Sequence, residues 1–172
     1  MKDQVRLTRQ FSRPCLRAPI RSRYVDELDA REGARKAETM PDTTYVEHVS
    51  CLTFAQTVDH LVDVIEKVGM NVFAKIDHAA GAKDVGMQLQ PSVVLIYGHA
   101  RGGTPIMQAA PGAALDLPLR VLIRVSDRGE TVIAFHPARP MLSRYAVHAE
   151  LVDRLAKAQQ LLVDAIQPSS PK

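Results

Sequence analysis

Hydrophobic and polar positions alternate with two different periods along the chain, and each change of period marks a predicted element. Residues 45–52 (YVEHVSCL) alternate with a period of two, which predicts a strand. Apolar side chains then recur every three to four positions, which predicts an amphipathic helix. Thr53 and Gln56 have the spacing of a capping box at its start, and Gly69 is the expected stop. Residues 70–77 (MNVFAKID) predict the second strand.

The second half of the chain continues with strands and ends with a helix. Residues 92–98 (SVVLIYG) form an unbroken apolar run, which is typical of a strand covered on both faces. Thr104 before Pro105 predicts a short helix that begins there, because proline is best tolerated at the first helical position. Residues 119–135 alternate on both sides of a glycine turn, which predicts a β-hairpin. Residues 147–162 carry the apolar stripe of a long final helix.

This order of elements predicts an α+β fold. The sheet should be antiparallel, with strand-helix-four strands-helix order and both long helices on one face, because hairpins and short loops connect the strands. The uncovered face should carry Arg120 and Arg124 together with Leu122, Ile133 or Phe135. A face of that composition is more apolar than most monomers expose, so it favours a homodimer ahead of a ligand.

Composition and charge divide the chain into a domain and two tails. With 46% hydrophobic and 24% charged residues, the chain suits one globular domain, which we place at residues 43–167, followed by a tail at 168–172. Residues 1–42 are basic, and the single acid Asp3 stands among the cations of their first half: Lys2, Arg6, Arg9, Arg13, Arg17, Arg21 and Arg23. Disorder, a misassigned start ahead of Met40, a targeting segment and a polyanion-binding arm all agree with this composition.

Several classes of protein are disfavoured by the sequence. No apolar run reaches the roughly 18–20 residues that span a bilayer, and no secretory core follows the basic start, so we expect a cytoplasmic protein without membrane association. Four Phe, four Tyr and no Trp speak against nucleic-acid binding except through the basic tail. Cys15 and Cys51 lack metal-type spacing; we expect Cys51 in the core and no disulfide.

The stretch KIDHAAGAKDVGMQLQP places an acid beside an imidazole. Adjacent strand residues point to opposite faces, so Asp77 is poorly placed to orient His78 as a catalytic base. We predict instead that Asp77 caps a short helical turn and that Gly81 and Gly86 complete this structural motif. No residue is assigned as catalytic.

The stretch GHARGGT is the best ligand-binding candidate. Arg101 supplies a positive charge, and its neighbouring glycines let backbone amides approach a small anionic ligand such as a phosphate or carboxylate. The stretch lacks the lysine and spacing of a P-loop, so a glycine turn before a proline-started helix is the alternative interpretation. The ligand-binding candidates are His78, Gly98, His99, Arg101, Gly102, Gly103 and Thr104. His78, His99 and His136 lack metal-ligand spacing, so no metal is predicted and any cofactor is unknown.

Two functions agree with these residues. The first is a non-catalytic homodimeric module that binds a small ligand or a protein partner. The alternative is an enzyme of unknown reaction that uses His78 or His99 with Arg101. Both raise the question of whether His78 meets the loop at residues 98–104 across the fold.

Residues 76–136 also resemble a known family through four motifs: DHAAGA, VGMQLQP, YGHARGGTPIMQAAP and LDLPLRVLI. They are similar to domain of unknown function family 302, and Pro105 and Pro118 lie in these motifs. The resemblance implies a compact domain of the TATA-binding-protein-like α+β fold, of bacterial or archaeal type, dimeric, and without an established activity. One departure is that family members usually have Asn-Pro where this chain has His99 and Ala100.

Overall fold

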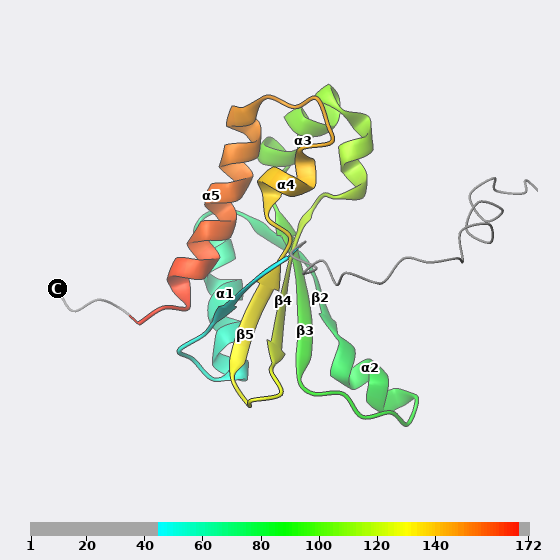
Figure 1. Ribbon diagram of the computed structural model, residues 1–172, viewed down its shortest axis with the longest axis vertical. Helices are drawn as coiled ribbons and strands as arrows, with labels where there is room; N and C mark the ends of the chain where they lie inside the picture. Colours follow the sequence, from blue (N-terminus) through cyan, green and yellow to red (C-terminus); the bar gives the residue numbers. More distant parts are fainter. Residues whose placement is uncertain (1–44, 169–172) are drawn as a thin grey trace, which may run out of the picture. The chain divides into compact units, whose positions relative to one another are not determined.

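The structure is a computed structural model that describes residues 45–168 (Figure 1). These residues belong to the second of two units of the chain, Met40–Lys172, and the first unit is Met1–Thr39. The predictions for the basic tail at residues 1–42 and for residues 169–172 lie outside the described residues. The elements, in chain order, are β1 (Val46–Val49), α1 (Phe54–Lys67), β2 (Asn71–Asp77), α2 (His78–Asp84), β3 (Ser92–Gly98), α3 (Ala100–Ala109), the 3-10 helix η1 (Pro111–Leu115), β4 (Leu119–Val125), β5 (Thr131–Phe135), α4 (Ala138–Leu142) and α5 (Ala149–Ala165).

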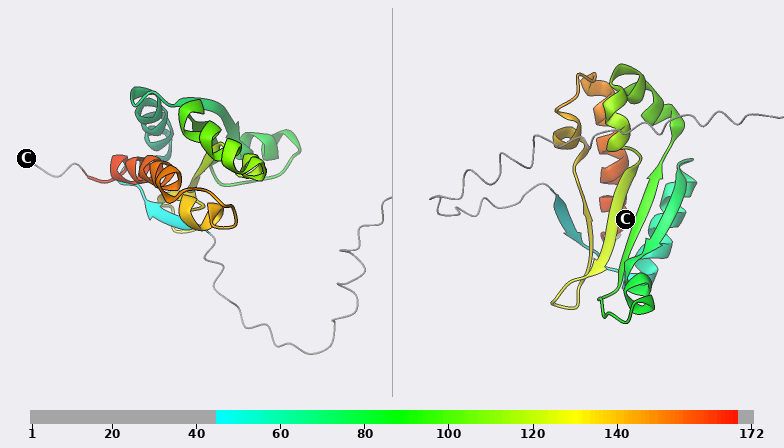
Figure 2. Two further views of the ribbon diagram at one scale, coloured as in Figure 1. Left: turned by 90° about the horizontal axis from the view of Figure 1, so that it is seen from above. Right: turned by 90° about the vertical axis from the view of Figure 1, so that its right-hand side faces the viewer.

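The five strands form one antiparallel sheet in the order β1-β5-β4-β3-β2, which confirms the predicted α+β class. The long helices α1 and α5 contact each other and share one face of the sheet, as the sequence predicts (Figure 2). Between this face and the helices lies the core, whose largest fully buried side chains include Tyr97, Leu61, Ile65 and Leu95. The core therefore depends on one covered sheet face, and the other face remains open.

The register of the strands decides which side chains reach the open face. Val121 and Ile123 of β4 are fully buried, whereas Arg120 is exposed, so the arginines point outward as expected. Ile133 pairs directly with Ile123, and paired residues share a face of the sheet. Ile133 therefore lies in the core, and the prediction that it joins Leu122 on the open face is wrong. Phe135 two residues later is also buried in the core, although it borders a hollow on the open face.

Local sequence signals account for the ends of α1. The side-chain oxygen of Gln56 accepts hydrogen bonds from the Thr53 backbone N–H at 3.2 Å and from the Thr53 hydroxyl at 2.8 Å. After the helix, Gly69 adopts a φ of +79°, a conformation that side chains with a Cβ rarely take. The predicted cap and stop are both confirmed. Cys51, by contrast, is exposed, because β1 ends at Val49 and the chain has already left the sheet.

Gln159 of α5 is a buried polar residue that the sequence analysis overlooked. Its side-chain oxygen accepts a hydrogen bond from the Ala138 backbone N–H, and its amide nitrogen donates to the His136 carbonyl, both at 2.8 Å. These two bonds satisfy backbone groups where β5 leads into α4, so Gln159 fastens that connection to α5.

Candidate functional site

His78 does not meet the loop at residues 98–104, which answers the question that the sequence left open. In the pairing of β2 with β3, Asp77 lies opposite Val93, while Asn71 lies opposite Gly98. His78 follows one end of this strand pair and the loop follows the other, roughly 20 Å away at about 3.3 Å per residue. Figure 1 accordingly shows α2 and α3 at opposite ends of the sheet. An enzyme that combines His78 with this loop is therefore ruled out by the topology.

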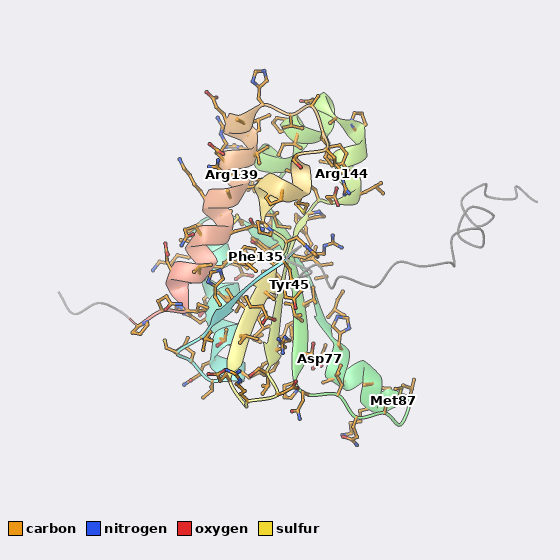
Figure 3. All side chains as sticks on the ribbon, in the orientation of Figure 1. Tyr45, Asp77, Met87, Phe135, Arg139 and Arg144 are labelled. Carbon is orange, nitrogen blue, oxygen red and sulfur yellow. The ribbon has the colours of Figure 1, made fainter. Side chains whose placement is uncertain are left out.

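The segment that begins at His78 forms a projecting arm. Asp77 caps α2, because its carboxylate accepts a hydrogen bond from the Ala80 backbone N–H at 2.9 Å, as predicted. None of the residues of α2 is buried, and Gly86 then turns the chain with a φ of +75°. Val85 and Met87, on either side of Gly86, are 71% and 65% exposed, and Met87 lies near the tip of the arm (Figure 3).

The loop at residues 98–104 is largely helical. α3 begins at Ala100, and the His99 imidazole caps it by accepting a hydrogen bond from the Arg101 backbone N–H at 2.9 Å. Gly102 and Gly103 both donate their backbone N–H to the His99 carbonyl, at 2.9 and 3.1 Å. The predictions that Thr104 is the N-cap and that Pro105 is the first helical residue are therefore wrong. The glycine pair takes part in the first turns of the helix instead of forming a turn before it.

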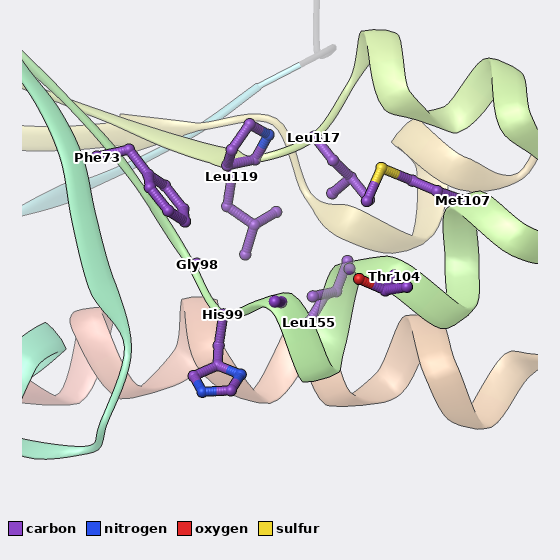
Figure 4. A pocket seen from close by; sticks show the side chains of 11 residues that line it. Phe73, Gly98, His99, Thr104, Met107, Leu117, Leu119 and Leu155 are labelled. Atoms are coloured by element: carbon purple, nitrogen blue, oxygen red, sulfur yellow. The ribbon is translucent and has the colours of Figure 1, made fainter.

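A pocket of about 240 Å³ opens where this helix meets the ends of the strands (Figure 4). Its lining residues come from β2, β3, α3, β4 and α5, and from residues 117–118, which precede β4. The lining residues are Phe73, Gly98, His99, Ala100, Gly103, Thr104, Met107, Leu117, Pro118, Leu119 and Leu155. In Figure 4, Phe73, Leu119, Leu117 and Leu155 surround the space, and the ring of His99 turns away from Leu119.

The pocket includes only part of the predicted ligand site. Gly98, His99, Gly103 and Thr104 line it, together with Pro118 of the predicted structural motif, which follows a cis peptide bond. The remaining candidates, His78, Arg101 and Gly102, do not line it. The lining is therefore apolar apart from one imidazole and one hydroxyl, and it contains no residue with a permanent charge. This composition differs from the anion site that the sequence suggested.

The sequence analysis missed the apolar half of the lining. Leu117 and Leu119 flank Pro118, and Leu155 comes from α5, far along the chain from Phe73 on β2. Within the sequence Phe73 is only one apolar residue of the predicted strand MNVFAKID, and its position at an interruption of the β2 pairing and its 54% exposure are seen only in the structure. No local pattern could have joined Phe73 to Leu155, because only the packing of α5 beside α3 brings them together.

The two glycines of the lining are not required by the backbone. Neither Gly98 nor Gly103 has a positive φ. A Cβ on Gly98 would lie 3.7 Å from both Phe73 and Pro118, which is ordinary van der Waals contact. A Cβ on Gly103 would lie 3.8 Å from the Met107 methyl and 3.9 Å from Leu117. Both positions could carry a side chain, so these glycines leave room in the pocket.

The open face of the sheet holds a second, broader hollow of about 340 Å³. Its lining mixes apolar and charged side chains: Tyr45, Glu47, Val94, Arg120, Leu122, Arg124, Ala134, Phe135 and His136. Arg124 of β4 forms an ion pair with Glu47 of β1, and the distance between their nitrogen and oxygen atoms is 2.6 Å. Val94 and Leu122 face each other on neighbouring strands and supply its apolar floor.

One polar cluster fastens η1 to the segment before α5. The Asp116 carboxylate accepts hydrogen bonds from Arg144 at 2.5 Å and from the Tyr145 hydroxyl at 2.7 Å. These bonds, that from Arg144 foremost, hold the pKa of Asp116 below its ordinary value. The cluster therefore has a structural role at the rim of the domain.

Two absences concern residues 45–168 alone. No group of three or more His, Cys, Asp or Glu side chains in this range is placed to hold a metal ion. Within the same range, no helix has both the length and the apolar character needed to cross a membrane.

Comparison with known proteins gives a family and a fold. The model of the family described as "Domain of unknown function DUF302" matches residues 46–168. The crystal structure of an uncharacterized conserved DUF302 protein from Bacillus stearothermophilus superposes with a TM-score of 0.66 at 13% identity, covering 73% of this chain and 99% of that chain. At that identity the likeness shows the fold alone.

Two curated relatives share 32% identity with this chain over 93 residues, which is 54% of its length. They are the fluoride-specific ion channels FluC 1 of Brucella suis biovar 1 and FluC 2 of Brucella melitensis biotype 1. The match covers 37% and 34% of these proteins, so the chain spans about a third of their length.

Proposed function

This chain belongs to the DUF302 family of domains of unknown function, and we propose that it is a non-catalytic homodimeric module that binds a small ligand. The observation that carries the ligand is the pocket of about 240 Å³ between the strand ends, α3 and α5. A concave, mostly apolar space with few polar groups is the usual form of a small-molecule site.

The chemistry of the lining supports binding without catalysis. Nucleophilic catalysis needs a nucleophile beside a base that is itself oriented by a third group. The pocket offers the Thr104 hydroxyl and the His99 imidazole, and it has no carboxylate, thiol or amine. The Nδ1 of His99 is already engaged as the cap of α3.

Native mass spectrometry of the protein purified from its own cells tests the ligand. We expect a population whose mass exceeds that of the chain by a small molecule, and we expect this excess to disappear on denaturation. The ligand-binding function would be contradicted by two results together. The native spectrum would show no bound small molecule, and incubation of the protein with a metabolite extract of the same cells would not add one.

The proposed dimer is supported by the apolar surface that the monomer leaves open. Val94 and Leu122 lie on the uncovered sheet face, and the arm beyond α2 exposes Val85 and Met87. Exposed apolar surface of this kind commonly marks an interface. Arg120 and Arg124 at the edges of the hollow would form the polar rim that interfaces usually have.

Size-exclusion chromatography with light scattering tests the dimer. Wild-type protein should elute with twice the chain mass, and Leu122→Asp should shift it to the monomer because it places a charge within the interface. Leu115→Asp is the matched control, since Leu115 is 84% exposed on η1, outside the proposed face. A monomeric wild type at micromolar concentration would refute the dimer.

A second candidate function is an accessory role in fluoride handling. It is supported by the two relatives that are named fluoride-specific ion channels and share 93 residues with this chain. Cells that lack the gene should then stop growing at a lower fluoride concentration than cells complemented with it, while their tolerance of chloride stays unchanged. Equal fluoride tolerance in the two strains would remove this candidate.

A further inference from the structure

The lining of the pocket narrows the class of its ligand. Among its eleven residues none carries a permanent charge, and Arg101, which the sequence suggested for an anion, does not line it. Placing a carboxylate or phosphate against such a wall would remove its hydration without supplying a partner charge, which is strongly unfavourable. The wall therefore selects against anions and in favour of uncharged apolar molecules.

The volume of the pocket limits the size of that molecule. An apolar protein cavity of about 150 Å³ stays dry and binds benzene. The space here is about 240 Å³, larger than a single ring needs and smaller than most drug-sized sites. One or two fused rings would fill it.

Phe73 adds a preference for an aromatic ligand. The pairing of β2 with β3 shifts between Val72 and Ala74, so Phe73 is the bulged residue, and bulges redirect side chains. Its ring lines the pocket and is nevertheless 54% exposed. Aromatic rings attract one another in stacked or edge-to-face geometry, so a planar ligand would cover this exposed ring.

Gly103 leaves space in the pocket, although glycine makes α3 less stable than alanine would. Glycine inside a helix is less stable than alanine, and Gly103 has neither a positive φ nor a close neighbour to justify it. A side chain there would enter the pocket toward Met107 and Leu117. Stability given up at a position that lines a cavity is typical of a functional site.

We propose that this pocket binds a small uncharged aromatic molecule of one or two rings, with Phe73 packed against its face. This inference rests on the proposed ligand-binding function and specifies the class of ligand. The Thr104 hydroxyl offers a polar contact at the pocket, whereas the ring of His99, also a lining residue, turns away from Leu119.

Indole and indole-3-carboxylate are the probes that test the class, because they share a ring system and differ in charge at pH 7. Methyl NMR of the wild-type protein should show saturable shifts of the Met107 and Leu119 methyl signals with indole. Indole-3-carboxylate should bind at least about tenfold more weakly, because its charge finds no partner in the wall.

Gly103→Leu should fill the pocket and weaken indole binding by at least about tenfold. Gly81→Leu is the matched control, since Gly81 is also helical and has open space around it, and it should bind indole as the wild type does. If Gly103→Leu does not fold, Phe73→Ala replaces it as the test. Phe73 is half exposed, so this change should spare the fold and lower the affinity for indole several-fold.

Three outcomes would overturn the inference: tighter binding of the carboxylate than of indole, unchanged indole binding by both pocket variants, or methyl shifts confined to residues outside the pocket. If native mass spectrometry still finds a small molecule on the protein, the ligand class alone is wrong. If it finds none and neither probe binds, the ligand-binding function fails as well.

Discussion

Replacing Gly103 with alanine tests whether this glycine serves the pocket or the backbone. Gly103 lies within α3 and does not have a positive φ. The added Cβ would meet the Met107 methyl at 3.8 Å and Leu117 at 3.9 Å, so it would make ordinary contacts without a clash. If the glycine is kept only for the space beside it, Gly103→Ala should make the protein more stable.

The expected gain follows from helix propensity. Alanine in a helix interior is about 0.5–1 kcal/mol more favourable than glycine, mainly because the unfolded chain loses less freedom. For a domain of this size, such a gain raises the melting temperature by about 2–5 °C. Urea unfolding followed by circular dichroism measures the free energy directly, and thermal unfolding checks it.

Gly69→Ala is the matched control for this experiment. A Cβ on Gly69 would have nothing within 4 Å, but its φ of +79° is strained for alanine, and α1, which ends there, packs on the core. This substitution should therefore lower the free energy of unfolding by about 1 kcal/mol. A loss of stability in Gly103→Ala equal to that in Gly69→Ala would refute the argument, since the backbone would then require glycine at both positions.

Three further predictions concern the fold around the site. Asp77→Ala removes a cap worth about 1 kcal/mol, so it should speed hydrogen exchange of the α2 amides. The melting temperature of the whole domain should not change, because α2 buries no residue, and a lowered melting temperature would contradict this. The hydrogen bond from Arg144 lowers the pKa of Asp116, so its stabilising contribution is present above the unfolded pKa and is lost as the pH falls through the folded one. Asp116→Asn should therefore show a smaller drop in melting temperature between about pH 5 and pH 2 than the wild type, and parallel curves would argue against this. Ile106→Ala should lower the free energy of unfolding by about 2–5 kcal/mol, because Ile106 is fully buried. Leu115→Ala on the surface should change it by less than about 0.5 kcal/mol. Urea unfolding measures both variants, and equal effects would contradict the packing.

Elements with strong local signals could be predicted from the sequence. The helix after Thr53 has a capping box at one end and Gly69 at the other, and both act on groups a few residues away. Asp77 caps the turn after β2 for the same reason. The hairpin of β4 and β5 follows from a period of two that continues across a glycine turn.

The start of α3 could not be predicted in this way. Gly102 and Gly103 ordinarily favour a turn, and histidine is not a common cap, so Thr104 before Pro105 was the stronger local signal. Packing overrides that preference, because Ile106 is fully buried in the core and α3 contacts α5. Tertiary contacts of this kind commonly outweigh local propensity.

By itself, the sequence determined the α+β class, most of the elements, and the motifs that carry the family resemblance, since all of these depend on residues close together in the chain. The tertiary structure alone decided where the residues of those motifs lie relative to one another. The register of β2 with β3 placed His78 and His99 at opposite ends of the sheet. The packing of α5 beside α3 brought Leu155 to the same pocket as Phe73 and Gly103 and left Arg101 out of its lining. Distances across a fold depend on register and packing between distant segments, and no local pattern in a chain encodes them.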